Sequence, residues 1–259
     1  MIPRRIHQIW VGPKPLPAKF AAWGEGIRRA HPGWTYQLWH DATVEAFLQE
    51  HFPQHLGIYR TTTSYSQKSD LARHAILAIH GGMYLDTDCE CRRPVDFVAD
   101  ADEIIVAHEL RTESKKVKEL YRTLRGELYC VWTILARPGH PLFFAVVEEI
   151  AQRLTRTLSP DPISNAIDQS GPGAFTDVLN RHLASGGHAR VVPGPWFGCP
   201  DGSTLFRFAR SFMFPELFRT VYVRHRSAAT WVDPKEKRRW MIRSFFFLGP
   251  PPPKQFKQP

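Results

Sequence analysis

The order of apolar and polar positions predicts strands that alternate with helices. Residues 5–11 form a short, β-prone run that Gly12-Pro13 closes, and residues 34–39 alternate large apolar with polar side chains. Residues 17–30 between these two strands have a helical pattern that stops before His31-Pro32-Gly33. This order predicts a β-α-β unit at the start of the chain.

A second helix and strand lead to a pair of carboxylates. Ser69 is a candidate N-cap for a helix with a broad apolar face over residues 70–80, which Gly81-Gly82 stops. Residues 83–85 then form a short, buried strand, so Asp86 and Asp88 follow its carboxyl end. Open α/β sheets bind ligands at that edge.

The rest of the chain continues the alternation less regularly. We expect strands at 103–108, 128–136 and 190–192, helices at 141–154 and 174–184, and a loop over the Ser-, Pro-, Asp- and Gly-rich residues 158–173. Strands that alternate with helices favour an α/β sheet over an all-α or all-β fold. We expect a single domain over residues 1–248 and a flexible, Pro-rich tail over residues 249–259.

Composition and charge narrow the choice of partners. The chain has 259 residues, 43% of them hydrophobic, which is enough for one substantial core, and its net charge of +9 favours an anionic partner. Its four cysteines include Cys89-x-Cys91, but no second close pair completes a zinc site, so we expect reduced thiols in the cytosol. The start of the chain does not read as a signal peptide, and no stretch reaches the length of a membrane-spanning helix.

Asp86 and Asp88 have several interpretations. On an extended strand, residues i and i+2 face the same side, so both carboxylates would reach one Mg²⁺ or Mn²⁺ ion; two exposed acids in a solvated turn are the simpler alternative. An EF-hand loop is excluded, because Cys91 and Phe97 stand where Gly and Glu are required. A haloacid-dehalogenase-like phosphatase, with Asp86 as nucleophile, remains the alternative, although Glu90 breaks its motif.

Several segments together resemble the family 32 glycosyltransferases. This family includes yeast Golgi mannosyltransferases, bacterial capsule and lipopolysaccharide enzymes and, more distantly, the glucosylating domains of clostridial toxins. The resemblance implies a GT-A fold, which is a Rossmann-like mixed sheet flanked by helices, and retention of the donor's anomeric configuration. The segments that carry it are IPRRIHQIWVG (2–12), PGWTYQLWHD (32–41), SDLARHAILAIHGGMYLDTDCECRRPVD (69–96), ARPGHPLF (136–143), SGPGAFT (170–176), and His225 with Thr230-Trp231.

The resemblance also implies which residues contact the donor. Trp10 would lie against the nucleotide base with Ile9 beside it, although a core aromatic explains Trp10 equally well. Asp70 and Arg73, one helical turn apart, would hold the ribose, sugar and diphosphate, whereas the alternative is a weak surface ion pair. Tyr84 would pack beside the donor; otherwise it is a buried strand tyrosine.

The same resemblance supplies a metal site and a closing segment. Asp86, Asp88 and His225 would bind Mn²⁺ or Mg²⁺, with Asp88 as the principal ligand, although a lone histidine is often structural. Thr230 and Trp231 stand where relatives often carry Ser-Trp and would close over the diphosphate. A second departure is Trp132-Thr133, where relatives commonly have an Asn near the sugar.

The resulting hypothesis is a metal-dependent, retaining glycosyltransferase with a nucleoside-diphosphate-sugar donor and a glycan, lipid-linked, lipopolysaccharide or capsule acceptor. We assign no catalytic base; Glu109 and Asp168 are open candidates for the acceptor side. The basic, aromatic residues 235–247 would contact an anionic inner membrane or form a solvated face, and we expect a cytoplasmic enzyme there. A noncatalytic sugar-binding or nucleic-acid-binding protein is the non-enzymatic alternative; acidic residues at the sheet edge argue against nucleic acid.

Overall fold

The computed structural model describes residues 1–159, 161–198 and 221–226, and its centre is a mixed sheet. Seven strands form this sheet in the order β2-β1-β3-β7-β5-β6, with β8 paired to β5, and β4 pairs with β9 in a separate ribbon. The strands are β1 (Arg5–Ile9), β2 (Thr35–Trp39), β3 (Gly82–Leu85), β4 (Cys89–Cys91), β5 (Ile104–Arg111), β6 (Glu127–Tyr129), β7 (Thr133–Ala136), β8 (Arg190–Val192) and β9 (Val223–His225).

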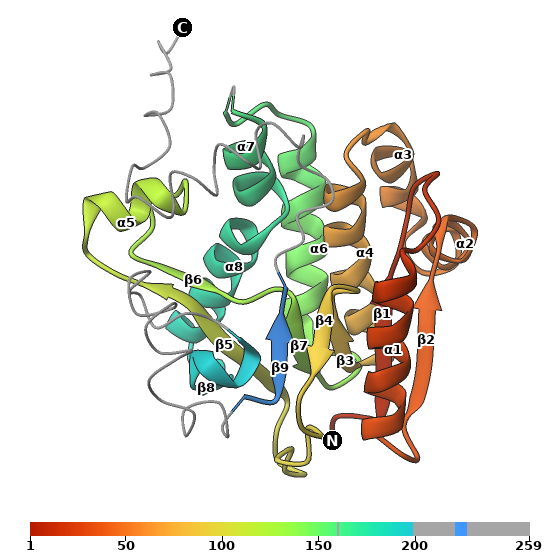
Figure 1. The fold of residues 1–259 in the computed structure, drawn as a ribbon. Helices are drawn as coiled ribbons and strands as arrows, with labels where there is room; N and C mark the ends of the chain where they lie inside the picture. The colour runs from red at the N-terminus through yellow and green to blue at the C-terminus, as the bar shows by residue number, and fades with distance from the viewer. Residues whose placement is uncertain (160, 199–220, 227–259) are drawn as a thin grey trace, which may run out of the picture.

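Helices cover the sheet. The described helices are α1 (Ala18–Ala30), α2 (Asp41–His51), α3 (Pro53–Thr61), α4 (Tyr65–His80), α5 (Lys115–Leu120), α6 (Pro141–Leu154), α7 (Pro162–Gln169), α8 (Pro172–Ala184) and the short 3₁₀ turn η1 (Gly194–Phe197). Helices α4, α6 and α8 pack together on one face, whereas α1 and the β4–β9 ribbon lie on the other (Figure 1).

The sheet changes direction at its centre. Strands β2, β1 and β3 are parallel, whereas β7 is antiparallel to both β3 and β5. The predicted β-α-β unit is confirmed as β1-α1-β2, and the predicted α/β class is confirmed as a Rossmann-like mixed sheet with helical layers. The carboxyl ends of β1 and β3 therefore meet at one edge.

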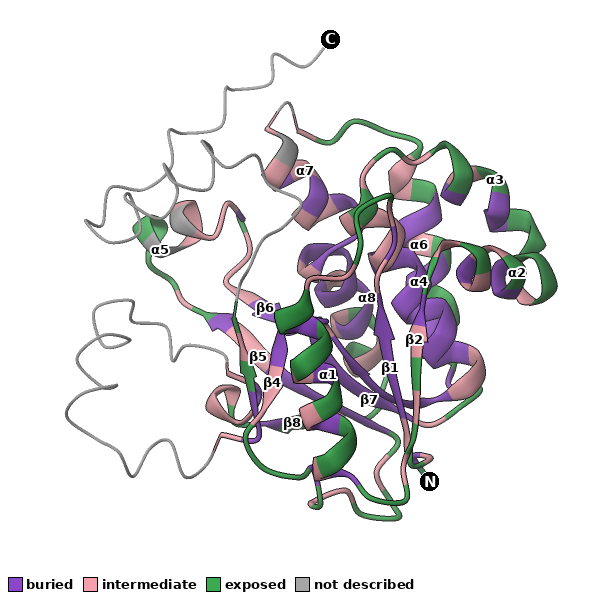
Figure 2. Ribbon diagram, turned by 45° about the vertical axis from the view of Figure 1, so that its right-hand side comes forward, coloured by how far each residue is buried: buried purple, intermediate pink, exposed green. Residues whose placement is uncertain are grey.

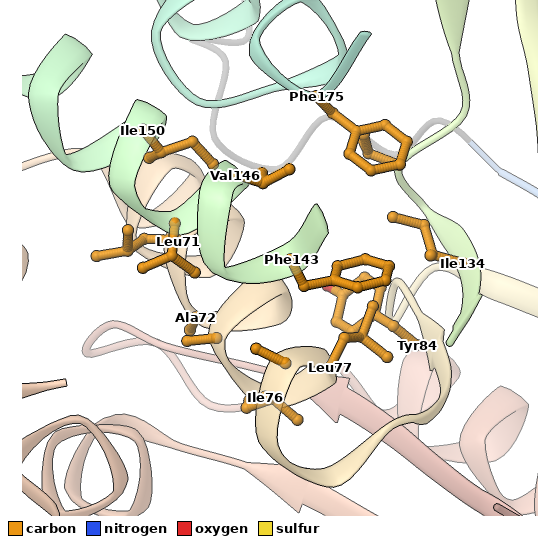
Figure 3. Packing of buried hydrophobic residues seen from close by; sticks show 14 of the residues in the cluster. Leu71, Ala72, Ile76, Leu77, Tyr84, Ile134, Phe143, Val146, Ile150 and Phe175 are labelled. Atoms are coloured by element: carbon orange, nitrogen blue, oxygen red, sulfur yellow. The ribbon is translucent and has the colours of Figure 1, made fainter. Parts of the chain in front are cut away.

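Both faces of the sheet are buried, which explains the continuous apolar runs in its central strands. In β3, Tyr84 faces the helical layer of α4 and α6, whereas Met83 and Leu85 face the side of α1. Figure 3 shows Phe143 of α6 packed with Leu77 of α4 and Tyr84 of β3. The edge strand β2 alternates exposed with less exposed residues, while β1 and β7 are buried (Figure 2).

Three sequence-based expectations need correction, and one stretch without a predicted element is helical. Helix α4 begins at Tyr65 with Ser64 as its N-cap, rather than after Ser69, because the Ser64 hydroxyl accepts the backbone N–H of Gln67. The expected loop 158–173 contains α7, which Asp161 caps by accepting the backbone N–H of Ser164. The expected strand 128–136 is two strands, β6 and β7, and residues 41–61, which had no assignment, form α2 and α3.

The expected Pro-rich tail at 249–259 and the basic, aromatic segment at 235–247 lie outside the described residues. Within the described residues, no helix has both the length and the apolar composition that a bilayer crossing requires.

Candidate functional site

The two acidic residues of the motif lie in a turn, not on an extended strand. Strand β3 ends at Leu85, the Asp86 N–H donates to the carbonyl of Trp132 at 3.0 Å, and the Cys89 N–H donates to the carbonyl of Asp86 at 3.0 Å. The i, i+2 geometry of a strand is therefore not what brings the carboxylates together. The turn directs both carboxylates toward the β4–β9 ribbon that follows it.

That ribbon supplies the third group of the cluster. Strand β4 pairs with β9 so that Cys89 lies opposite His225. The His225 Nε2 lies 3.2 Å from Asp88 Oδ1 and 3.9 Å from Asp86 Oδ2. One ligand atom from each of the three residues falls within 4.8 Å of the others.

This donor set fits a divalent cation. Carboxylate oxygens suit Mg²⁺ and Mn²⁺, and the added imidazole nitrogen favours a transition metal such as Mn²⁺. Burial opposes protonation of His225, but the hydrogen bond and charge of Asp88 and the charge of Asp86 outweigh it, so the pKa of His225 is raised. A site that attracts a proton to this imidazole also attracts a cation in its place.

Arg73 lies behind Asp86 and fixes it. Its guanidinium donates to the Val131 carbonyl at 2.7 Å and lies 2.8 Å from Asp70 Oδ1 and 3.3 Å from Asp86 Oδ1. Burial alone would lower the pKa of Arg73, but Asp86 and Asp70 raise it, so the group stays charged. Only 6% of the side chain is exposed, and the guanidinium faces these two carboxylates.

Tyr84 and Asp70 complete this buried group. The Tyr84 hydroxyl donates to Asp86 Oδ1 at 2.7 Å, and its ring lies 4.7 Å from the Arg73 guanidinium. Burial raises the pKa of Asp70, whose Oδ2 accepts a hydrogen bond from Ser170 at 2.7 Å. The Asp70–Arg73 pair is therefore buried, and the surface ion-pair alternative is wrong.

Ile9 and Trp10 lie at the same edge of the sheet. Ile9 ends β1 in the core, and Trp10 is half-buried just beyond it. The Trp10 indole N–H donates to the Lys14 carbonyl at 2.7 Å, and its ring meets Phe20 edge-on. Because β1 is parallel to β3, Trp10 and Asp86 both follow carboxyl ends of neighbouring strands. Thr230 and Trp231 lie outside the described residues.

Sequence reasoning missed two residues that hold the turn, Gln8 and Tyr36, and a third, Ser170, that holds Asp70. The Gln8 side-chain amide donates to the Asp86 carbonyl at 3.0 Å, and the Tyr36 hydroxyl donates to the Gln8 side-chain oxygen. Ser170 was part of the quoted SGPGAFT segment but had no assigned role, although it holds Asp70. A polar residue inside a buried strand was the available signal for Gln8, because such residues need a specific partner.

Glu109 lies near the cluster, whereas Asp168 does not contact it. Glu109 sits where the β5–β6 register shifts between His108 and Leu110. Burial raises the pKa of Glu109 to about 7; His225 acts to lower it and Asp86 to raise it. Asp168 instead forms an ion pair with Arg125.

Comparison with known proteins agrees with this geometry. Residues 17–111 match the family model described as the glycosyltransferase sugar-binding region containing the DXD motif. The uncharacterized glycosyltransferase L373 of Acanthamoeba polyphaga mimivirus is 29% identical over 184 residues, which are 70% of this chain and 66% of that protein. Inositol phosphoceramide mannosyltransferase 1 of Schizosaccharomyces pombe is 35% identical over 98 residues, which are 37% of this chain and 30% of that protein.

A solved structure shares the fold. The PaToxG glycosyltransferase superposes with a TM-score of 0.55 at 16% identity, covering 71% of each chain. The matched regions are less than two thirds of the two curated relatives' lengths. The family match includes Asp70, Arg73, Tyr84 and both aspartates of the turn. Residues 17–111 are therefore similar to the glycosyltransferase sugar-binding region that contains the DXD motif, and the fold of the chain is of the GT-A type.

Proposed function

We propose that the protein is a metal-dependent, retaining glycosyltransferase. It would move a sugar from a nucleoside-diphosphate donor to a glycan, a lipid-linked acceptor, or a lipopolysaccharide or capsule chain. The observation that carries this proposal is the convergence of Asp86, Asp88 and His225 at the carboxyl edge of β3, with Arg73 buried behind them. The family match favours this function over a phosphatase or a noncatalytic binding protein.

The residues of the cluster have separate roles in this proposal. Asp86, Asp88 and His225 would hold the cation, which supplies positive charge to the diphosphate as the glycosidic bond breaks. Arg73 positions Asp86 through its 3.3 Å contact. Trp10, at the end of β1, offers an aromatic face to the base of the donor.

Retention of configuration is supported by the family resemblance. In the front-face route, the departing phosphate takes the proton of the acceptor hydroxyl, so the nucleophile needs no side-chain base. Thr230 and Trp231 would close over the diphosphate. The metal would be Mn²⁺ or Mg²⁺.

The donor is proposed from the name of a relative, and the acceptor from the net charge of the chain. Because one relative is named an inositol phosphoceramide mannosyltransferase, a nucleoside-diphosphate mannose is the first donor to test. The net charge of +9 favours an anionic acceptor or membrane surface, so we place the reaction in the cytoplasm beside a membrane.

The test is release of free nucleoside diphosphate from a panel of UDP- and GDP-sugars, with Mn²⁺ or with EDTA. We expect one donor to be hydrolysed or transferred only with the metal. Asp88→Asn should lower that rate at least about 100-fold, because it removes a ligand that stabilises charge in the transition state.

Asp100→Asn is the matched control, because Asp100 is exposed and the variant has the same change in charge. It should keep the wild-type rate. If no donor reacts, or if EDTA leaves the rate unchanged, the proposed function is wrong. Analysis of the anomeric configuration of the product by NMR then tests retention separately.

A further inference from the structure

Trp132 connects both halves of the cation cluster. It lies between β6 and β7, and only 8% of it is exposed. Its carbonyl accepts the Asp86 N–H at 3.0 Å and the Cys89 thiol at 3.7 Å, so its backbone holds the acidic turn. Its indole ring stacks on the imidazole of His225, with ring centroids 4.4 Å apart and planes inclined by 14°.

The indole itself is held in place from its other edge. Its Nε1–H donates to the carbonyl of Phe197 at 2.8 Å. Phe197 ends η1 and is buried in the same apolar cluster as Trp132. The stacking surface offered to His225 is therefore fixed by a hydrogen bond as well as by packing.

The imidazole of His225 needs such a surface to restrict its rotation. Pairing of β9 with β4 fixes its backbone, but an imidazole still turns about two side-chain torsions. A flat face at 4.4 Å restricts these rotations and leaves Nε2 directed at Asp88, 3.2 Å away. Mutation of a group that orients a metal ligand typically costs about 10- to 100-fold in metal affinity or activity.

We propose that Trp132 is a positioning residue for the cation site: its indole holds the His225 imidazole in the orientation in which Nε2 faces Asp86 and Asp88. This inference rests on the proposed function, since it assumes that the cluster binds a divalent cation. It also gives a role to the tryptophan that stands near the position where the resemblance led us to expect an Asn. Its consequence is that the cation affinity depends on the aromatic face of Trp132 and not only on its volume.

The experiment measures Mn²⁺ binding by calorimetry with no donor present. Trp132→Phe keeps a flat ring and should bind Mn²⁺ within about threefold of wild type, whereas Trp132→Leu should lose about 10- to 100-fold in affinity. Trp34→Leu is the matched control, because Trp34 packs edge-on against His31, a histidine outside the cluster, with ring centroids 5.2 Å apart. Its Mn²⁺ affinity should equal that of wild type.

A double-mutant cycle separates positioning from general structural support. In the His225→Ala background, Trp132→Leu should cost no further Mn²⁺ affinity, because the indole acts only through the imidazole. An equal loss in both backgrounds would show that Trp132 merely supports the core. Circular dichroism checks folding, and Trp132→Met replaces Trp132→Leu if the latter does not fold, because Met adapts to irregular core space.

The outcomes for the two proposals are distinct. Binding of Mn²⁺ by wild type together with unchanged affinity in folded Trp132→Leu overturns this inference and leaves the proposed function intact. Failure of wild type to bind Mn²⁺ overturns the metal dependence of the proposed function, and this inference with it.

Discussion

At the residue scale, the balance of charge around Arg73 decides how the acidic turn is held. The guanidinium faces Asp70 and Asp86 and is shielded from water, so each carboxylate depends on it. In a buried pair, removal of one partner leaves an uncompensated charge, and this costs more than the attraction seen in an exposed pair.

Arg73→Met should therefore lower the free energy of unfolding by about 3 to 5 kcal/mol. Arg60→Met is the control, because Arg60 makes a 3.0 Å pair with Glu45 while 56% of its side chain is exposed. That variant should lose less than about 1 kcal/mol. Urea denaturation measures the free energy of unfolding of both variants. Similar losses in the two variants would show that the buried ion pair contributes no more to stability than the exposed one.

His7 predicts how stability depends on pH. Trp39 Nε1–H donates to His7 Nδ1 at 3.1 Å, so the neutral ring carries its proton on Nε2 and donates it to the Gly81 carbonyl at 3.0 Å. Burial lowers the pKa of His7 to about 3. Between pH 6.5 and 3 the unfolded chain binds a proton that the folded chain does not, so acidification destabilises the fold in this window.

His7 should contribute a slope of up to about 1.4 kcal/mol per pH unit in that window. His7→Gln should reduce the pH dependence of the unfolding free energy by that amount, whereas His188→Gln, at an exposed position, should leave it unchanged. Denaturant titrations at pH 7, 6 and 5 measure the slopes. An unaltered slope in His7→Gln would contradict this assignment.

At the scale of elements, Gly82 sets the junction between α4 and the strand that leads to the site. It has φ of +92°, and a Cβ there would lie 2.5 Å from the Arg5 carbonyl oxygen of β1. A side chain at this position would strain the backbone and push β3 away from β1.

Gly82→Ala should therefore lower the free energy of unfolding by about 1 to 3 kcal/mol. Gly26→Ala, inside α1 with no atom within 4 Å of the added Cβ, should instead raise it by about 0.5 to 1 kcal/mol. Thermal unfolding shows whether each variant is less or more stable than wild type. A Gly82→Ala protein as stable as wild type would show that the β1–β3 pairing tolerates the added carbon.

Elements with strong local signals were predictable from the sequence. The Gly81-Gly82 stop, the buried run of β3 and Pro141 at the start of α6 were assigned correctly because each acts within a few residues. The start of α4 was misplaced although Ser64 and Gln67 form a recognisable capping pattern. Helix α7 was missed because its composition resembles a loop, and the Asp161 cap and tertiary contacts override that composition.

The candidate site was predictable only in part, for a physical reason. Asp86, Asp88, Arg73 and Asp70 lie within one segment, so a motif identifies them together. His225 pairs with Cys89 from a distant strand, and Gln8 and Ser170 act through single long-range hydrogen bonds. Spacing along the chain carries no information on such contacts, and the role of His225 came from resemblance alone.

At the scale of the whole molecule, the fold places the carboxyl end of β1, which Trp10 follows, beside the acidic turn after β3. Two apolar clusters, one on each face of the sheet, bury the side chains of these strands. The central claim is that this edge binds a nucleoside diphosphate through a cation. Metal and nucleotide should then bind cooperatively, each raising the affinity for the other by the same factor.

The most direct measurement is the affinity for GDP and UDP with Mn²⁺ and with EDTA, in wild type and in Asp88→Asn. We predict that Mn²⁺ raises the affinity of wild type for one nucleotide at least about tenfold, within the usual range of coupling between sites, and that Asp88→Asn abolishes this gain. Equal affinity with and without Mn²⁺, or an undiminished gain in Asp88→Asn, would contradict the account.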